Sequence, residues 1–253
     1  MHSLFHRRES ESAPVVEPVP TVFPRIEGAD IAAVFSGKRM AGDFYDSIRV
    51  SPERVLIGLL DIAGPRKANR NLLTIAQNIF RTAGAELFAG PDINEADAMT
   101  ELSLHINRGL IEAEAHVHSC PAFIACYHEK FGTLCYTNAG HTPGLVRDAR
   151  GVVELDSTGL PLGLFSHTTA DARIVALEKG AVLLLVSRGV VACERNHGNS
   201  DEFGLDRVNQ TFQNATAVDA KSLCTSVLNA AAEFTCAGPP SDDRTALALA
   251  RTA

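Results

Sequence analysis

The stretch Val55-Leu-Ile-Gly-Leu-Leu-Asp-Ile-Ala63 is a short apolar run with one acidic residue, Asp61, near its end. An apolar run of this length followed by Gly64-Pro65 is typical of a buried strand that ends in a turn. A carboxylate beside a core strand costs free energy unless it is paired or bound to a cation. The stretch therefore predicts a core strand with a candidate site residue at its end.

The chain around this strand alternates between helical and strand patterns. Apolar residues recur at three- and four-residue spacing over residues 72–87, 95–111 and 217–234, which predicts three helices. Short β-prone segments separated by turn signals cover residues 122–128, 133–138, 144–147, 152–155, 173–177, 181–187 and 245–250. Many short strands with a few helices indicate a layered α+β domain.

Composition excludes some classes of partner. The chain has 253 residues, a formal net charge of -7 and no run of Lys or Arg, so nucleic acid is a poor partner. No apolar stretch approaches the ~20 residues that a membrane-spanning helix needs, and the start lacks the apolar region of a secretory signal. We therefore expect no membrane partner.

The cysteines indicate a cellular location, and the composition of residues 1–24 indicates a domain boundary. The 6 cysteines include no CxxC pair, which favours reduced thiols and a cytoplasmic protein. Residues 1–24 are rich in proline and lack apolar periodicity. We expect residues 1–24 to form a flexible tail and residues 25–253 to form the folded domain.

Three short clusters carry candidate chemistry: Ala41-Gly-Asp-Phe-Tyr-Asp46, Asp61-Ile-Ala-Gly64 and Ser241-Asp-Asp-Arg-Thr245. Taken singly, a Gly-Asp pair is typical of a turn, and an Asp that ends a strand usually caps the next turn or helix. The order in which the clusters occur is more specific than any one of them.

In that order, and with Asn138-Ala-Gly-His141 between them, the clusters resemble the PPM-type, metal-dependent protein Ser/Thr phosphatases. The resemblance is to the branch of stage II sporulation protein E and the RsbU-type regulators. Further matching stretches are Gly159-Leu-Pro-Leu-Gly163, Glu178-Lys-Gly180 and Phe203-Gly204. The resemblance implies a four-layer α-β-β-α sandwich, two antiparallel sheets flanked by helices, with Mn²⁺ or Mg²⁺ ions at one end.

The resemblance also implies a role for each acidic residue. Asp61 would bridge two metal ions. The Ile62 backbone carbonyl would complete the coordination of the second ion, and Asp242 would be a ligand of the first. Asp43 would act in catalysis by holding metal-bound water, with Asp46 nearby. Hard divalent cations prefer oxygen ligands, and the hydroxide they generate attacks phosphorus without a protein nucleophile.

One position departs from the family pattern. After the strand at residues 181–186 the family has Thr/Ser-Asp-Gly, and that Asp ligates the first metal, whereas this chain has Ser187-Arg-Gly189. A guanidinium has no lone pair for a cation. We expect Arg188 to point toward Asp61 and Asp242, where the first metal would stand, and to offer a fork for phosphate. The site would then hold one ion or none.

Two main functions remain open. The first is a metal-dependent phosphoprotein phosphatase-like regulator that hydrolyses phosphomonoesters and acts on a phosphorylated regulatory protein such as an anti-sigma factor antagonist. The second is a pseudophosphatase that binds a phosphoprotein or partner without turnover. A purely structural regulatory domain would differ from the second only in lacking phosphate affinity. The retained Asp43, Asp61 and Asp242 favour the first function, and Arg188 favours the second.

Overall fold

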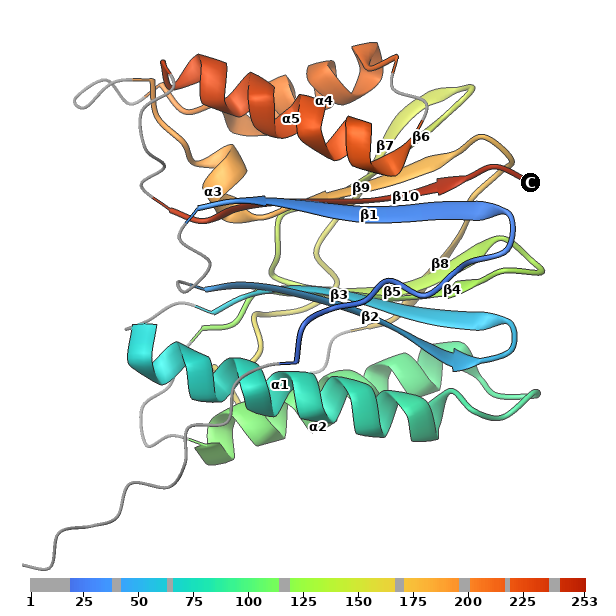
Figure 1. Cartoon of the computed structure of the whole chain (residues 1–253). Coiled ribbons are helices and arrows are strands. Elements are labelled where there is room, and N and C mark those ends of the chain that lie inside the picture. Colours follow the sequence, from blue (N-terminus) through green and yellow to red (C-terminus); the bar gives the residue numbers. More distant parts are fainter. Residues whose placement is uncertain are drawn as a thin grey trace, which may run out of the picture.

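The computed structural model (Figure 1) describes residues 19–37, 42–62, 66–113, 119–166, 171–195, 201–216, 219–236 and 242–253. The helices are α1 (Arg66–Leu87), α2 (Glu95–Ala113), α3 (Arg188–Val191), α4 (Gly204–Asn214) and α5 (Ala220–Phe234). The strands are β1 (Ala29–Ser36), β2 (Asp43–Ser51), β3 (Arg54–Asp61), β4 (Ala122–His128), β5 (Thr133–Ala139), β6 (Gly144–Asp148), β7 (Gly151–Leu155), β8 (Arg173–Ala176), β9 (Val182–Val186) and β10 (Arg244–Arg251).

The strands form two five-stranded sheets that face each other. Sheet A has the order β1-β10-β9-β6-β7 and sheet B the order β2-β3-β4-β5-β8. The pairings between the named strands are all antiparallel. Helices α1 and α2 cover the outer face of sheet B, and α4 and α5 cover that of sheet A (Figure 1). The expected four-layer α-β-β-α sandwich is confirmed.

Strand β3 shows why the apolar run of the sequence lies at the centre. Because side chains alternate across a strand, Val55, Ile57 and Leu59 point into the core between the sheets. Leu56 and Leu60 point the other way and pack beneath α1 and α2. Both faces of β3 are covered, so the strand is continuously apolar rather than alternating.

The described start of the chain lies against the helical layer. The Gln77 side chain of α1 accepts a hydrogen bond from the Val19 N–H at 2.7 Å and donates to the Val19 carbonyl at 2.8 Å. Thr21 donates to the Tyr45 carbonyl at 2.7 Å, and the Phe23 ring stacks on Tyr45. These contacts join the end of the expected tail to the domain, while residues 1–18 lie outside the described residues.

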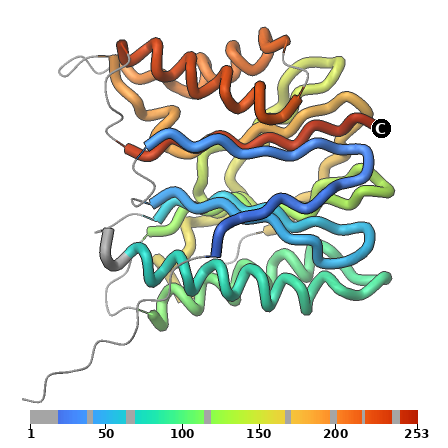
Figure 2. Tube along the Cα trace, viewed as in Figure 1, coloured from blue at the N-terminus to red at the C-terminus, as the bar shows by residue number. Residues whose placement is uncertain are grey.

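The first and last strands of the chain lie side by side. Strand β1 pairs with β10 along its whole length, and Figure 2 shows them as adjacent blue and dark red segments. The helix expected over residues 217–234 begins at Ala220, because Asp219 accepts a hydrogen bond from the Ser222 N–H at 2.8 Å and caps it. In the described part of the chain, none of the helices is long and apolar enough to cross a membrane.

Candidate functional site

The candidate site lies at the end of the sandwich where β2 begins and β3 ends. The register of these strands places Asp43 directly opposite Asp61, and the Ile62 N–H donates to the Gly42 carbonyl at 3.0 Å. Both acidic residues share the strand face of the residues that pack between the sheets. Two carboxylates from separate sequence clusters therefore meet at the inner edge of sheet B.

Close backbone approach explains two glycines of the site. A Cβ on Gly42 would lie 2.9 Å from the Ile62 carbonyl oxygen, and a Cβ on Gly189 only 1.9 Å from the Asp243 carbonyl oxygen. Real Cβ atoms do not approach oxygen so closely. Gly189 therefore lets the residue before it, Arg188, lie against the segment that leads into β10.

A pair of hydroxyl residues joins the ends of β9 and β10 and holds Asp43. The Ser187 N–H donates to the Thr245 carbonyl at 2.9 Å, and the Thr245 N–H donates to the Ser187 hydroxyl at 3.0 Å. The Thr245 hydroxyl in turn donates to Asp43 Oδ2 at 2.7 Å. Both hydroxyl residues stand within the sequence motifs, yet sequence reasoning assigned them no role, because their partners are set by the pairing of distant strands.

The pKa of Asp43 is strongly perturbed. Burial raises this pKa from its ordinary value of 3.8 to about 7, hydrogen bonds from Ser187 and Thr245 oppose the shift, and the negative charges of Asp61 and Asp243 add to it. At neutral pH Asp43 is therefore divided between its charged and its protonated form.

Arg188 stands between two of the predicted metal ligands. Its Nη2 lies 3.0 Å from Asp242 Oδ2, and its Nε lies 3.7 Å from Asp61 Oδ2. Burial raises the pKa of Asp61, the Arg188 charge works against that shift, and Asp242 adds to it. The side chain of Arg188 is 64% exposed, so the guanidinium can reach a ligand from solvent. The structure thus brings Asp43, Asp61, Asp242 and Arg188 to one end of the sandwich, while their chemical roles stay predictions.

The Ile62 carbonyl, predicted to ligate a metal, already has a protein partner. The buried Asn69 of α1 donates its Nδ2 hydrogen to this oxygen at 2.8 Å. The contact ties the first turns of α1 to the end of β3. No motif in the sequence pointed to Asn69.

The residues present do not fit a two-metal centre. Arg188 places a permanent positive charge against Asp61 and Asp242. Within the described ranges, no three side chains of His, Cys, Asp or Glu are grouped in a way that would hold a metal ion. The residues Ala41, Ala63, Gly64 and Ser241 of the three clusters lie outside those ranges.

Asp46 is not beside Asp43 in the site, contrary to expectation. Residues three apart on a strand point to opposite faces, so Asp46 faces α1. It is fully buried there and accepts hydrogen bonds from Arg81 Nε at 2.6 Å and Nη2 at 3.0 Å. Gln77 donates to the same carboxylate at 3.1 Å. Asp46 therefore joins β2 to the helical layer.

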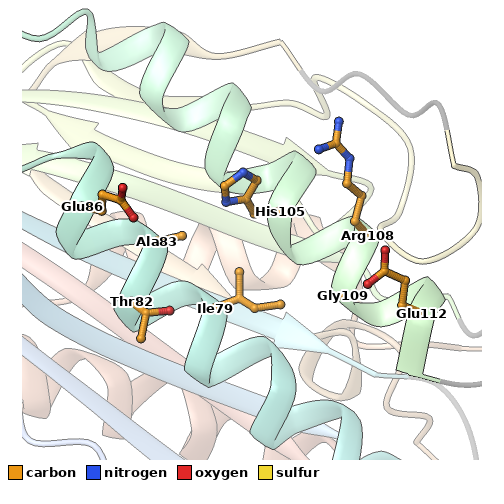
Figure 3. Close-up of a pocket in the computed structure, with 8 residues that line it drawn as sticks. All are labelled: Ile79, Thr82, Ala83, Glu86, His105, Arg108, Gly109 and Glu112. Carbon is orange, nitrogen blue, oxygen red and sulfur yellow. The ribbon is translucent and has the colours of Figure 1, made fainter.

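A second feature, an open groove of about 430 Å³, lies on the outer surface between α1 and α2. Figure 3 shows the residues that line it: Ile79, Thr82, Ala83, Glu86, His105, Arg108, Gly109 and Glu112. None of these residues belongs to the carboxylate site.

Solved structures with the same architecture define the class. The RsbU and RsbW domains of Rv1364c from Mycobacterium tuberculosis superpose with a TM-score of 0.74 at 21% identity, over 91% of this chain and 63% of that one. The PP2C phosphatase domain of SpoIIE from Bacillus subtilis, solved with a fragment of its regulatory domain, gives a TM-score of 0.71 at 13% identity, over 90% and 64%. The fold is that of the PP2C, or PPM-type, phosphatases.

Within that class, the chain belongs to the stage II sporulation protein E (SpoIIE) family, whose profile matches residues 52–252. Two phosphoserine phosphatases of Bacillus subtilis are similar in sequence. RsbU is 24% identical over 184 residues, 70% of this chain and 51% of RsbU. RsbP is 24% identical over 157 residues, 62% of this chain and 38% of RsbP. The chain thus spans about half the length of RsbU and less of RsbP.

Proposed function

We propose that this domain binds a phosphorylated regulatory protein and turns it over poorly, as a pseudophosphatase of its family. The observation that carries the proposal is the pair of contacts from Arg188 to Asp242 at 3.0 Å and to Asp61 at 3.7 Å. The Arg188 guanidinium is part of the chain, so its positive charge lies beside Asp61 and Asp242 and neutralises them without a bound ion. It leaves them poorly available to a divalent ion.

The same residue supplies a recognition group for phosphate. Guanidinium is planar and donates in a fork that matches phosphate oxygens. Arg188 directs Nη2 to Asp242 and Nε to Asp61, and its side chain is 64% exposed, so the rest of the guanidinium stays open to a phosphate while these contacts remain. Because the pKa of Asp43 is about 7, part of the negative charge that would repel phosphate is neutralised at physiological pH.

The family and its relatives support a proposal for the chemistry of the partner. The two similar sequences are named phosphoserine phosphatases, which supports a phosphoserine-bearing protein such as an anti-sigma factor antagonist. All 6 cysteines are free thiols, which fits a cytoplasmic location. We assign the binding function to residues 25–253.

Metal-dependent hydrolysis of the phosphomonoester, with Mn²⁺ or Mg²⁺, is the second candidate. It is favoured by the retention of Asp43, Asp61 and Asp242 at one end of the sandwich. For it to operate, Arg188 must leave both of its carboxylate partners when the ions bind.

Substitution of Arg188 separates the two candidates. Arg188→Asp replaces the competing cation with an oxygen donor, so we expect stronger Mn²⁺ binding and at least about tenfold faster Mn²⁺-dependent hydrolysis of p-nitrophenyl phosphate. The same variant should bind a phosphoserine peptide more weakly than wild type does. Mn²⁺ affinity, hydrolysis and peptide binding are measured on the same preparations.

The matched control is Arg195→Asp. Arg195 is 56% exposed and faces Asp201 at 3.8 Å, so this change reverses the charge of a comparable arginine outside the site. It should alter neither hydrolysis nor peptide binding. Brisk Mn²⁺-dependent turnover by wild type, unchanged or lower in Arg188→Asp, would show that the domain is an active phosphatase.

A further inference from the structure

A single hydroxyl group connects the two sheets at the site. Thr245 lies near the start of β10 in sheet A, and its hydroxyl donates to Oδ2 of Asp43, where β2 of sheet B begins. Both strands begin at the left end of the sandwich in Figure 1. Leu247 and Leu249 of β10 point into the core between the sheets, so alternation places Thr245 on the same inner face. A hydroxyl in such a place costs free energy unless it is hydrogen-bonded.

The contacts of Thr245 fix the direction of its hydroxyl. The Thr245 carbonyl accepts from the Ser187 N–H at 2.9 Å, and the Thr245 N–H donates to the Ser187 hydroxyl at 3.0 Å. Both side chains are fully buried. A hydroxyl has one hydrogen to donate, and Thr245 directs it to Asp43 over 2.7 Å. Thr245 therefore holds the Asp43 carboxylate toward sheet A.

Arg188 lies within reach of the side chain at position 43. Asp43 and Asp61 face each other in the β2–β3 register, and directly opposed residues have Cβ atoms about 5 Å apart. The Nε of Arg188 lies 3.7 Å from Asp61 Oδ2. The Arg188 charge opposes the rise in the pKa of Asp61. Hydrogen bonds from Ser187 and Thr245 oppose the rise in the pKa of Asp43. The two neighbouring carboxylates thus have separate partners.

We propose that Thr245 is a positioning residue that keeps the Asp43 carboxylate away from Arg188, so that the guanidinium stays open to the phosphate of the partner. This inference rests on the proposed function. Without the hydroxyl, the buried carboxylate loses a donor while a permanent cation lies close by. Hydrogen bonds between a carboxylate and a guanidinium are stronger than those from a neutral hydroxyl. Asp43 would therefore turn to Arg188 and compete with phosphate there.

Substitutions that keep the size of the side chain test the proposal. Thr245→Val keeps the shape and removes the hydroxyl, whereas Thr245→Ser keeps the hydroxyl. Thr137→Val is the matched control, because Thr137 is a fully buried threonine of β5 whose hydroxyl donates to the Asp171 carbonyl at 3.5 Å, outside the site. Affinities for free O-phosphoserine are measured at pH 8, above the Asp43 pKa of about 7.

Thr245→Val should bind O-phosphoserine about fivefold more weakly than wild type, because one more carboxylate then competes for Arg188. Thr245→Ser and Thr137→Val should bind it as wild type does. In an Asp43→Asn background, Thr245→Val should leave the affinity unchanged, because no carboxylate remains to turn. A merely structural role of Thr245 would not be cancelled by Asp43→Asn.

Melting temperatures give a second readout that needs no ligand. Arg188→Met should lower the melting temperature of Thr245→Val by more than it lowers that of wild type, because only Thr245→Val pairs Arg188 with Asp43. The excess should vanish when Asp43→Asn is added. If Thr245→Val does not fold, Thr245→Ala takes its place in both measurements.

The other outcomes separate the role of Thr245 from the proposed function. Unchanged or tighter binding by Thr245→Val overturns the inference, since Asp43 then stays in place or takes up a proton there. A loss that persists in the Asp43→Asn background overturns it too, as does an equal loss in Thr137→Val. If wild type does not bind O-phosphoserine, the proposed function fails and the melting temperatures decide. An equal effect of Arg188→Met with and without the hydroxyl then overturns the role of Thr245.

Discussion

At the scale of single residues, Asp43 combines burial with negative neighbours. It lies opposite Asp61 in the β2–β3 register, and the negative charges of Asp61 and Asp243 both raise its pKa. The Ser187 and Thr245 hydroxyls offset part of this cost. In the folded protein its pKa is about 7, against 3.8 for an ordinary aspartate. The folded state therefore binds a proton more tightly than the unfolded chain does.

The first prediction follows from the sign of this shift. A raised carboxyl pKa makes the folded state less stable as pH rises from about 4 to 7, after which the loss is constant. Asp43→Asn removes the titrating group, so we expect it to stabilise the protein by on the order of 2 kcal/mol at pH 8 and by little at pH 4. Urea unfolding in the presence of a chelator, repeated across this range, measures the difference.

The exposed Asp92 provides the control for this series, since Asp92→Asn makes the same chemical change at the surface. Its unfolding free energy should follow the wild-type pH profile. If Asp43→Asn is less stable than wild type at pH 8, the carboxylate is stabilised by neighbours other than those described.

At the scale of elements, helix α1 is tied to sheet B by polar contacts as well as by its apolar face. Leu72, Ala76 and Phe80 pack on the sheet. Arg81 forms a two-pronged ion pair with the buried Asp46 of β2. Removing one partner of such a pair leaves a buried charge without its counter-ion.

The second prediction is a double-mutant cycle on this pair. Arg81→Met should lower the free energy of unfolding by about 2 kcal/mol, a figure reduced from that of a fully buried pair because Arg81 is 29% exposed. In an Asp46→Asn background the same change should cost much less, since no buried charge remains. Arg150→Met, at the exposed pair with Asp148, should leave stability almost unchanged. Additive effects at positions 46 and 81 would show that the pair contributes no coupling.

Elements with an uninterrupted apolar pattern could be predicted from the sequence, and elements whose apolar pattern is broken or sparse could not. Strands β3 and β4 are continuously apolar and were predicted almost to the residue. Strand β2 was missed because Asp43, Asp46 and Arg49 interrupt its pattern. Helix α4 was missed because it buries few of its residues, with Val208 and Phe212 as the buried ones.

The sequence predicted the acidic residues of the site but not the hydrogen bonds that hold them. Motifs located Asp61 and Asp242, and the position of Arg188 beside them followed from its place after β9. The hydrogen bonds of Thr245 to Asp43 and of Asn69 to Ile62 depend on which strands and helices meet. That information belongs to the packing of the molecule and not to any one segment of sequence.

At the scale of the whole molecule, the site is made by both sheets. Asp43 and Asp61 belong to sheet B, whereas Ser187, Arg188 and Asp242 lie at the end of sheet A. Their contacts cross from one half of the sandwich to the other. A ligand held by residues of both sheets is lost on unfolding and therefore stabilises the entire domain.

The last prediction uses this linkage to measure how well the site holds a cation. Because Arg188 competes for Asp61 and Asp242, millimolar Mn²⁺ should raise the melting temperature of wild type by no more than about 2 °C, as expected for one weakly held ion. Arg188→Asp should show a clearly larger rise, and Asp61→Asn/Asp242→Asn should show none. NaCl at matched ionic strength controls for the effect of salt. A large rise in wild type that the double variant abolishes would mean that Arg188 yields to the metal, and the metal-dependent phosphatase would then be the better description of the protein.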